Sequence, residues 1–231
     1  MHMCGRFTLT AGLGEIVERF QVDEHQGVEH APRYNIAPSQ EVPVVIVAKE
    51  KRQLLMMRWG LIPRWAKDPS IGNRLINARS ETLTQKPAFR RSFQRHRCLV
   101  PADGFYEWKK SDTGTKQPMR VIIDNGSLFA FAGLWDQWSD DSGETRYSFT
   151  IVTTRPNEKM QEIHNRMPVI LHQAEEEAWM DPQMGDPALL APFLEPYEPE
   201  EMAIYPVSKA VNSSKSDRPE MIRPLGGARA G

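Results

Sequence analysis

Apolar positions along the chain fall mostly into short runs, and only a few segments show the spacing of an amphipathic helix. Leu13, Ile16 and Phe20 recur three or four residues apart, which predicts a short helix over Ala11–Val22. The other apolar runs are short and rich in β-branched or aromatic residues, which favours strands. The expected strands are Val42–Ala48, Leu54–Trp59, Cys98–Val100, Gly104–Trp108, Met119–Ile123, Leu128–Leu134, Tyr147–Thr153, Met167–Leu171 and Met202–Val207.

Four further helices are expected between these runs. One begins at Pro87, since proline is tolerated at a first helical position, and ends near Arg95. Another follows Asn157, a plausible N-cap, and ends near Ile163. The last two are Gln173–Met180 and Ala188–Leu194. Strands dominate and do not alternate regularly with helices, so the pattern predicts a mixed α+β fold with a strand-rich sheet and a few short flanking helices.

The composition is that of an ordinary globular protein. The 231 residues carry 29 Lys+Arg against 30 Asp+Glu, a formal net charge of −1, and 40% are hydrophobic. Wholesale disorder and fibrous classes are therefore excluded. No apolar run reaches about 18 residues and the start lacks the apolar core of a signal peptide, so we expect a cytoplasmic protein without a membrane span. We expect one domain over residues 1–231, with residues 1–3 a cloning remnant or propeptide and a polar tail from about residue 210.

Charge is unevenly distributed along this balanced chain. Between Lys51 and Cys98 twelve basic residues oppose two acidic ones, whereas nine acidic residues and no Lys or Arg lie between Gln173 and Ser208. The basic segment is typical of a surface for a polyanion. Ordinary surface charge that mixes in three dimensions is the alternative. The aromatic residues within or beside this segment suit either base stacking or a core: Trp59, Trp65, Phe89, Phe93, Tyr106 and Trp108.

Cys4 stands near the start of the chain and is followed by a glycine. A lone cysteine is usually a small buried apolar residue. Exposed as residue one, it would instead carry an amine with a pKa of about 7.7–8 and a thiol with a pKa of about 8.5, two carbons apart. That pair can attack one aldehyde twice, because the amine forms a Schiff base and the thiol then closes a five-membered thiazolidine.

Two further polar motifs are candidates for a site. The run Asn77–Thr82 combines Asn, Arg and Glu, which suits contacts to an anion, but a strand-to-helix turn capped by Ser80 is the favoured interpretation. Alternation along Gly104–Trp108 places Glu107 on the same face as Phe105. An apolar setting there would favour a general acid, whereas an exposed strand glutamate is the alternative.

His164 and Arg166 come just before an apolar strand. A histidine at such a junction can act as acid or base near neutral pH, and the arginine could clamp a phosphate. A lone histidine is more often structural. His96 and Cys98 lack the partners of a zinc site, and the sequence holds no Gly-rich phosphate loop. We therefore expect no metal and no cofactor.

Seven motifs follow one another in a specific order. They are Met3–Phe7, Tyr34–Pro38, Arg58–Pro63, Asn77–Thr82, Cys98–Trp108, Phe131–Trp135 and His164–Val169, and the pairs Val211-Asn212 and Arg223-Pro224 follow near the end. In this order they resemble the SOS-response-associated peptidase (SRAP) family. The resemblance covers essentially the whole chain.

The resemblance implies a single α+β domain with a bifurcated sheet around a cleft. It implies a protein of the DNA damage response that binds single-stranded DNA and crosslinks covalently to abasic sites, with a thiol autopeptidase activity that exposes Cys4 and a possible abasic-site lyase side activity. We expect a monomer that is associated with the nucleoid when bound to DNA. The implied catalytic residues are Cys4, Asn77, Glu107 and His164, and the implied DNA-binding residues are Arg79, Arg166, Trp65 and Pro38.

Two other functions stay open at this point. A thiol peptidase would use Cys4 as nucleophile with His164 and Glu107 as its partners. A non-covalent single-strand binder would use the basic segment and would be indifferent to abasic sites. Because Met1 and His2 precede Met3, the aminothiol exists only if cleavage falls between Met3 and Cys4.

Overall fold

Five strands close into a small barrel in the computed structural model, which describes residues 5–111 and 114–227. Each strand of the barrel pairs with the next, and the last strand, β9, closes the barrel by pairing with the first, β10. The strands in this order are β10 (Thr145–Thr154), β4 (Lys51–Trp59), β3 (Glu41–Ala48), β6 (Arg97–Ala102) and β9 (Phe129–Ser139). The pairing of β10 with β4 is parallel and the others are antiparallel, so the expected mixed sheet is confirmed.

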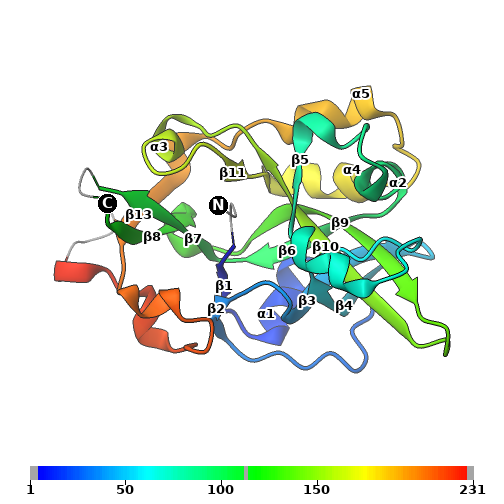
Figure 1. Ribbon diagram of the computed structural model, residues 1–231, viewed down its shortest axis with the longest axis horizontal. Helices are drawn as coiled ribbons and strands as arrows, with labels where there is room; N and C mark the ends of the chain where they lie inside the picture. The colour runs from blue at the N-terminus through cyan, green and yellow to red at the C-terminus, as the bar shows by residue number, and fades with distance from the viewer. Residues whose placement is uncertain (1–4, 112–113, 228–231) are drawn as a thin grey trace.

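A second, five-stranded sheet branches from the barrel (Figure 1). One residue, Asp103, separates β6 of the barrel from β7 of this sheet, so the chain passes directly from one to the other. The strands in order are β13 (Met202–Pro206), β8 (Lys116–Ile123), β7 (Gly104–Lys110), β1 (Phe7–Leu9) and β2 (Arg33–Ile36). This branching matches the bifurcated sheet expected from the resemblance.

Three very short strands complete the barrel sheet. β5 (Asn77–Arg79) runs parallel to β10, and β11 (Met167–Pro168) runs antiparallel to it. β12 (Ile170–Leu171) pairs with β9. The end of β10 is therefore flanked by two segments that carry candidate site residues.

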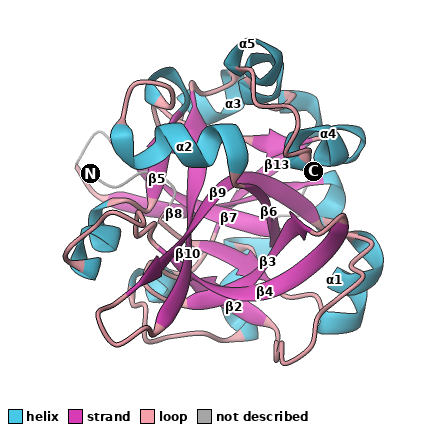
Figure 2. Ribbon diagram, turned by 90° about the vertical axis from the view of Figure 1, so that its right-hand side faces the viewer, coloured by secondary structure: helices cyan, strands magenta, loops and turns pink. Residues whose placement is uncertain are grey.

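The helices are short and lie around the strands (Figure 2). They are α1 (Leu13–Arg19), α2 (Pro87–Arg95), α3 (Glu158–Gln161), α4 (Glu176–Met180) and α5 (Pro187–Leu190). The 3₁₀ helices are η1 (Pro69–Arg74), η2 (Ser80–Thr82), η3 (Asp124–Gly126), η4 (Gln173–Glu175), η5 (Ala191–Leu194), η6 (Pro199–Glu201), η7 (Lys209–Asn212), η8 (Pro219–Ile222) and η9 (Leu225–Gly227). Asn157 caps α3 as expected, since its side chain accepts from the Met160 amide at 2.9 Å. In the described part of the chain, no helix has the length and apolar character needed to cross a membrane.

One aromatic core joins the barrel to the second sheet. The Phe7 ring of β1 lies 5.2 Å from the Trp59 ring of β4 and 5.8 Å from the Phe131 ring of β9. Phe105 of β7 packs on Phe131 at 5.9 Å. Because all four rings are fully buried, the position of β1 is fixed by the same core that stabilises the barrel.

The structure differs from the expectations at several places. β2 lies within a stretch where no strand was expected, and its pairing with β1 supplies the strand geometry. Ser80 is the first residue of η2 and Arg79 is its N-cap, so the expected Ser80 cap is wrong. The segment from about residue 210, expected to be a polar tail, packs on the second sheet through Val211 and Met221, which are buried with Tyr106.

Candidate active site and nucleic-acid interface

β7 presents Glu107 on the inner face of the second sheet. Phe105 belongs to the main core, whereas Tyr106 belongs to a separate cluster on the opposite face, so the predicted alternation is confirmed. Glu107 is only 2% exposed and lies opposite Met119 of β8. A carboxyl group in this position is shielded from bulk water, as proton transfer in a closed site requires.

The start of the described chain runs beside Glu107. Phe7 of β1 pairs with Phe105, and the Arg6 carbonyl accepts from the Tyr106 amide at 3.0 Å. The next step of this antiparallel register brings Gly5 to the level of Glu107. Cys4, the expected nucleophile, lies outside the described residues.

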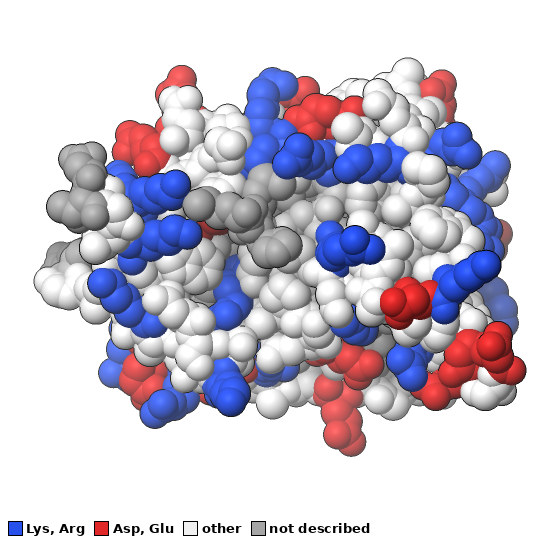
Figure 3. All heavy atoms as spheres, viewed as in Figure 1, with Lys and Arg blue, Asp and Glu red and all other residues white. Residues whose placement is uncertain are grey.

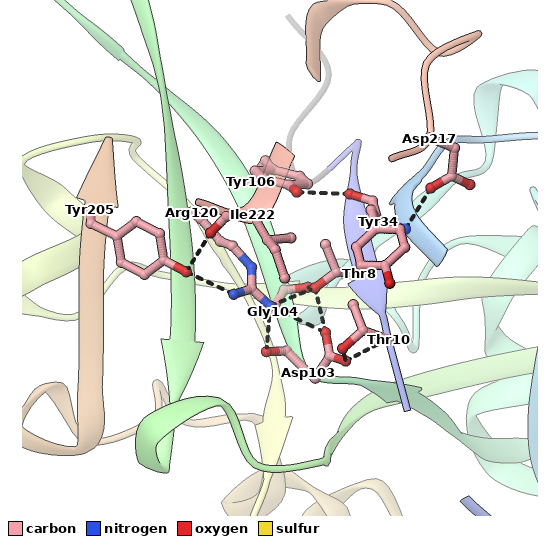
Figure 4. Close-up of polar contacts among 10 residues, drawn as sticks. All are labelled: Thr8, Thr10, Tyr34, Asp103, Gly104, Tyr106, Arg120, Tyr205, Asp217 and Ile222. Carbon is pink, nitrogen blue, oxygen red and sulfur yellow. Dashed lines mark hydrogen bonds and ion pairs between the residues drawn. The ribbon is translucent and has the colours of Figure 1, made fainter. Parts of the chain in front are cut away.

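A buried polar network fixes β1 at the corner between β6 and β7 (Figure 4). The Asp103 carboxylate accepts from the Thr8 hydroxyl at 2.5 Å and from the Thr10 hydroxyl at 2.6 Å. Arg120 donates to the same carboxylate at 3.3 Å and to the Tyr205 hydroxyl at 2.7 Å. The strand that leads to Cys4 is therefore held from both of its faces, by aromatic packing on one and by this network on the other.

His164 follows α3 and has a fixed ring orientation. Its amide donates to the Met160 carbonyl at 2.8 Å, and its Nδ1 lies 3.2 Å from the Arg166 amide nitrogen and 3.3 Å from the Arg166 carbonyl oxygen, so the Arg166 backbone engages this nitrogen in either tautomer. Partial burial lowers the pKa of the His164 imidazole, and the positive charge of Lys116 lowers it further, although a backbone hydrogen bond to Arg166 opposes both. The ring is therefore mainly neutral at pH 7.

Neighbours of Glu107 and of His164 line one cavity. Its volume is about 320 Å³, and its walls include Met119, the register partner of Glu107, and Ile163, the residue before His164. An ion pair between Lys109 of β7 and Glu162 closes one side, with 3.5 Å between Nζ and Oε2. The cavity wall thus contains residues next to both predicted acid–base residues, Met119 opposite Glu107 and Ile163 before His164, and these come from different elements.

The end of β10 brings the two predicted phosphate-binding arginines together. In β5, Asn77 is the register partner of Ile151 and Arg79 that of Thr153, and Arg166 donates to the Thr153 carbonyl at 2.6 Å. Because Arg166 is two residues from His164, Asn77, Arg79, Arg166 and His164 form one group around this strand end. Asn77 and Arg79 come from one sequence motif, and His164 and Arg166 come from another. The two motifs meet because both lie beside the end of β10.

Glu81 is a site residue that the sequence motif contained but did not reveal. Its carboxylate accepts from both terminal nitrogens of Arg166, with 2.9 Å between Nη2 and Oε2. This hydrogen bonding lowers the pKa of Glu81 below its ordinary value. The two residues lie 85 positions apart in the sequence, and only the pairing of β5 and β11 with the same strand connects them.

Trp65 and Pro38 lie at the carboxyl end of β4. Trp65 is 57% exposed on the loop that follows the strand. Pro38 is half-buried in a turn whose Ser39 amide donates to the Trp59 carbonyl at 2.9 Å. The same Trp59 donates from its indole to the Ile76 carbonyl, just before β5, at 2.8 Å. These two residues therefore flank the β5 side of the site and do not belong to the group around His164.

The basic segment is only partly available to a ligand. Arg97 is buried and donates to the backbone carbonyls of Phe93 and Trp179, and burial lowers its pKa to about 10. Arg64 pairs with Asp136. On the face shown in Figure 3, Lys and Arg side chains lie around the middle as well as near the margin, whereas most Asp and Glu lie near the margin. Of the aromatic residues in the segment, Trp59, Phe89 and Phe93 belong to the core.

Comparison with known proteins decides the family. The family model described as SOS response associated peptidase (SRAP) matches residues 3–214. The chain belongs to the SRAP family. The SRAP match includes every predicted site residue from Cys4 to Arg166.

Individual SRAP relatives agree over nearly the whole chain. The abasic site processing protein YoqW of Bacillus subtilis (strain 168) is 48% identical over 222 residues, which are 95% of this chain and 99% of that protein. The abasic site processing protein HMCES of Xenopus tropicalis is 32% identical over 95% of this chain and 78% of its own length. A crystal structure of a protein from Bacteroides thetaiotaomicron matches with a TM-score of 0.86 at 27% identity, over 96% of this chain and 99% of that one.

Proposed function

We propose that this protein binds single-stranded DNA and bonds covalently to abasic sites through Cys4. The β1–β7 register carries the proposal, because it brings Gly5, the neighbour of Cys4, to the level of the buried Glu107. The names of the relatives, abasic site processing proteins, supply the substrate. Such a protein processes DNA enzymatically and belongs to the DNA damage response.

The reaction joins the aminothiol of an N-terminal Cys4 to the aldehyde of a ring-opened abasic sugar. The amine nitrogen attacks the aldehyde carbon and gives a carbinolamine, which loses water to form an imine. The thiol sulfur then adds to the imine carbon and its proton passes to the nitrogen, which closes a thiazolidine. One water is released for each crosslink, and no oxidant or reductant is consumed.

Glu107 is the residue best placed to move the protons. Its burial beside the Cys4 end of β1 suits a carboxyl that protonates the leaving hydroxyl of the carbinolamine. His164 is mainly neutral, and Arg166 holds its Nδ1, so Nε2 is left to bond the sugar oxygen as the ring opens. Asn77 orients the Cys4 amine in this scheme. An imine to deoxyribose also favours β-elimination, which gives a minor strand-cleaving activity.

The DNA backbone is held by Arg79 and Arg166 in this proposal. Both arginines border the end of β10, and guanidinium groups bind phosphate oxygens with two hydrogen bonds. Trp65 and Pro38 contact bases at the other end of β5. A single strand fits this arrangement better than a duplex, because an exposed indole stacks on an unpaired base.

Cys4 must first become residue one. Met3 precedes it, so hydrolysis of the Met3–Cys4 bond has to expose the amine. We assign this step to the protein itself, with the Cys4 thiol as nucleophile and with Glu107 and His164 as proton carriers. The peptidase in the family description is then a self-cleavage.

A denaturing gel with abasic single-stranded DNA tests the proposal. The processed protein is expected to give a shifted band without added reductant, and intact mass should show the sum of the two partners minus one water. Cys4→Ala should abolish the band. Cys98→Ala is the matched control and should keep it, because Cys98 is fully buried and burial raises the pKa of its thiol.

The same gel separates the competing functions. A non-covalent binder would bind DNA reversibly and leave no band with the processed protein, which would refute the crosslinking proposal. A general thiol peptidase would cleave unrelated peptides and would need no DNA. Loss of self-cleavage in Glu107→Ala or His164→Ala, seen by intact mass over time, would support the processing step.

A further inference from the structure

Trp65 is an exposed aromatic residue on the loop between β4 and β5, and the contacts of this loop fix its position. The loop runs from Gly60 to Ile76 between β4 and β5. Trp65 is 57% exposed, whereas Trp59 and Trp138 are buried. A large indole left in water at the rim of a DNA site is a candidate contact rather than a packing residue.

Both neighbours of Trp65 are tied to β9. The carboxylate of Asp136 accepts from the Arg64 amide at 3.0 Å and from its guanidinium Nη2 at 3.1 Å. The indole of Trp138 donates to the Ala66 carbonyl at 2.7 Å. Asp136 and Trp138 are both buried and stand two residues apart on one strand, so they point to the same face and act as a pair of anchors.

The rest of the loop is packed as tightly. Ile62 and Ala66 form a small core with Trp138, and the Ile62 amide donates to the Ser148 hydroxyl at 2.8 Å. At the base of the loop Gly60 has a φ of +126°, and a Cβ there would lie 2.5 Å from the Gly72 carbonyl oxygen. The backbone at residue 60 therefore requires glycine, and its close contact with Gly72 holds the start of the loop against its later part.

We propose that Asp136 and Trp138 are positioning residues that hold Trp65 as a preformed stacking platform for a nucleobase next to the abasic site. This inference rests on the proposed function, since it takes the strand beside the abasic site as the ligand. The anchors order the loop before DNA binds. Binding therefore costs less conformational entropy, and more of the stacking energy contributes to affinity. The ligand class is an unpaired base, which every nucleotide offers except an abasic one.

The test compares two single-stranded oligonucleotides by fluorescence anisotropy. Each carries a central tetrahydrofuran analogue, which has no aldehyde, so binding is reversible. In the first, both neighbouring nucleotides carry bases; in the second, both are tetrahydrofuran spacers. Trp65→Ala, Asp136→Asn and Trp138→Phe are each expected to weaken binding of the first oligonucleotide about tenfold, in line with the loss of one stacked base.

The second oligonucleotide separates positioning from folding. It has no neighbouring base to stack, so the three variants should bind it like the unmodified protein. In a Trp65→Ala background, Asp136→Asn and Trp138→Phe should add nothing further. Asp141→Asn, an exposed aspartate on the same hairpin, and Trp179→Phe, which loses a similar indole bond to the Cys98 carbonyl, are matched controls.

Three results would overturn the inference. The first is an unchanged affinity of Trp65→Ala for the first oligonucleotide, and the second is an unchanged affinity of either anchor variant for it. The third is an equal loss of affinity for both oligonucleotides. If Asp136→Asn does not fold, Trp138→Phe carries the test, because phenylalanine keeps an aromatic ring in the small core and removes the N–H, and Trp179→Phe controls for the smaller ring. Failure of the crosslinking proposal would show separately, as a missing band with a true abasic site, and this binding assay does not depend on it.

Discussion

At the scale of single residues, Glu81 bonds the guanidinium nitrogens of Arg166 that would otherwise be available to a phosphate. The two terminal nitrogens of Arg166 bond the Glu81 carboxylate, which is itself 55% exposed. A carboxylate and a phosphate present similar pairs of oxygens to a guanidinium. If Arg166 binds DNA as proposed, an incoming strand has to displace the Glu81 carboxylate first.

Glu81→Gln is expected to tighten reversible binding of single-stranded DNA about three- to tenfold, because it removes the carboxylate that competes with phosphate for Arg166. The effect is modest because a surface ion pair such as Glu81–Arg166 contributes little free energy. Anisotropy at low salt measures the change. Glu24→Gln removes a carboxylate that pairs with Lys51, away from the site, and serves as the control. Weaker binding by Glu81→Gln would show that Glu81 supports Arg166 rather than competing for it.

Lys116 tunes His164 from a neighbouring strand. Its charge is one of the causes that lower the pKa of His164, and burial is the largest. Replacing Lys116 with Gln removes the repulsion of the imidazolium, so the pKa of His164 should rise toward about 6.5. The acidic limb of the crosslinking rate should then move to higher pH, because protonated His164 persists to a higher pH.

An NMR titration of the His164 ring checks this directly, without DNA. Lys110→Gln is the matched control, because Lys110 lies opposite Lys116 in the β7–β8 register. It should leave the pKa of His164 where it is. If Lys116→Gln also left the titration in place, the charge of Lys116 would have no part in setting the pKa.

At the scale of elements, β1 depends on partners outside itself. Three residues make the strand, and its position comes from the aromatic core on one face and from Asp103 on the other. Asp103→Ala removes an acceptor for two threonines and leaves Arg120 buried without its carboxylate. We expect a loss of about 3 kcal/mol in the free energy of unfolding.

Urea unfolding measures that loss, and amide exchange locates it. The amides of Phe7, Thr8 and Leu9 should exchange faster in Asp103→Ala than the amides of β9, because the strand loosens before the barrel does. Asp141→Ala, at an exposed position of the β9–β10 hairpin, should change stability by less than about 0.5 kcal/mol. Uniform faster exchange in both strands would mean that Asp103 stabilises the whole fold and does not anchor β1 in particular.

Local patterns located the elements whose own residues carry the signal. The α2 helix begins at Pro87 and ends at Arg95 as predicted, and the alternation along β7 gave the face of Glu107. β2 and β5 could not be found in this way, because they are three or four residues long and only pairing with β1 and β10 makes them strands.

The candidate site was predictable as motifs but not as contacts. Asn77, Glu107 and His164 stand in recognisable runs, whereas the pairing of Glu81 with Arg166 and the influence of Lys116 on His164 depend on how distant strands meet. The role of Cys4 stays a prediction. The anchors of Trp65 carried no motif at all, since Asp136 and Trp138 look like ordinary strand residues in sequence.

At the scale of the whole molecule, net charge and local charge give different expectations for DNA. The chain has a net charge of −1, and several arginines of its basic segment hold the fold. Part of the positive charge of the segment is therefore engaged within the fold, and reversible binding of DNA should be weaker and less dependent on salt than its twelve basic residues suggest. In the proposed function, the covalent bond to the abasic site provides the lasting attachment.

Salt titrations of reversible binding test this division of labour. For a single strand, the slope of log affinity against log salt changes by about 0.7 for each phosphate contact, so Arg79→Gln should make the slope shallower by that amount. Arg155→Gln, which removes an exposed arginine paired with Glu195, should leave the slope unchanged. Once a true abasic site has reacted, high salt should not release the DNA. A steep slope that Arg79→Gln does not change would contradict this prediction, because it would place the phosphate contacts on other residues.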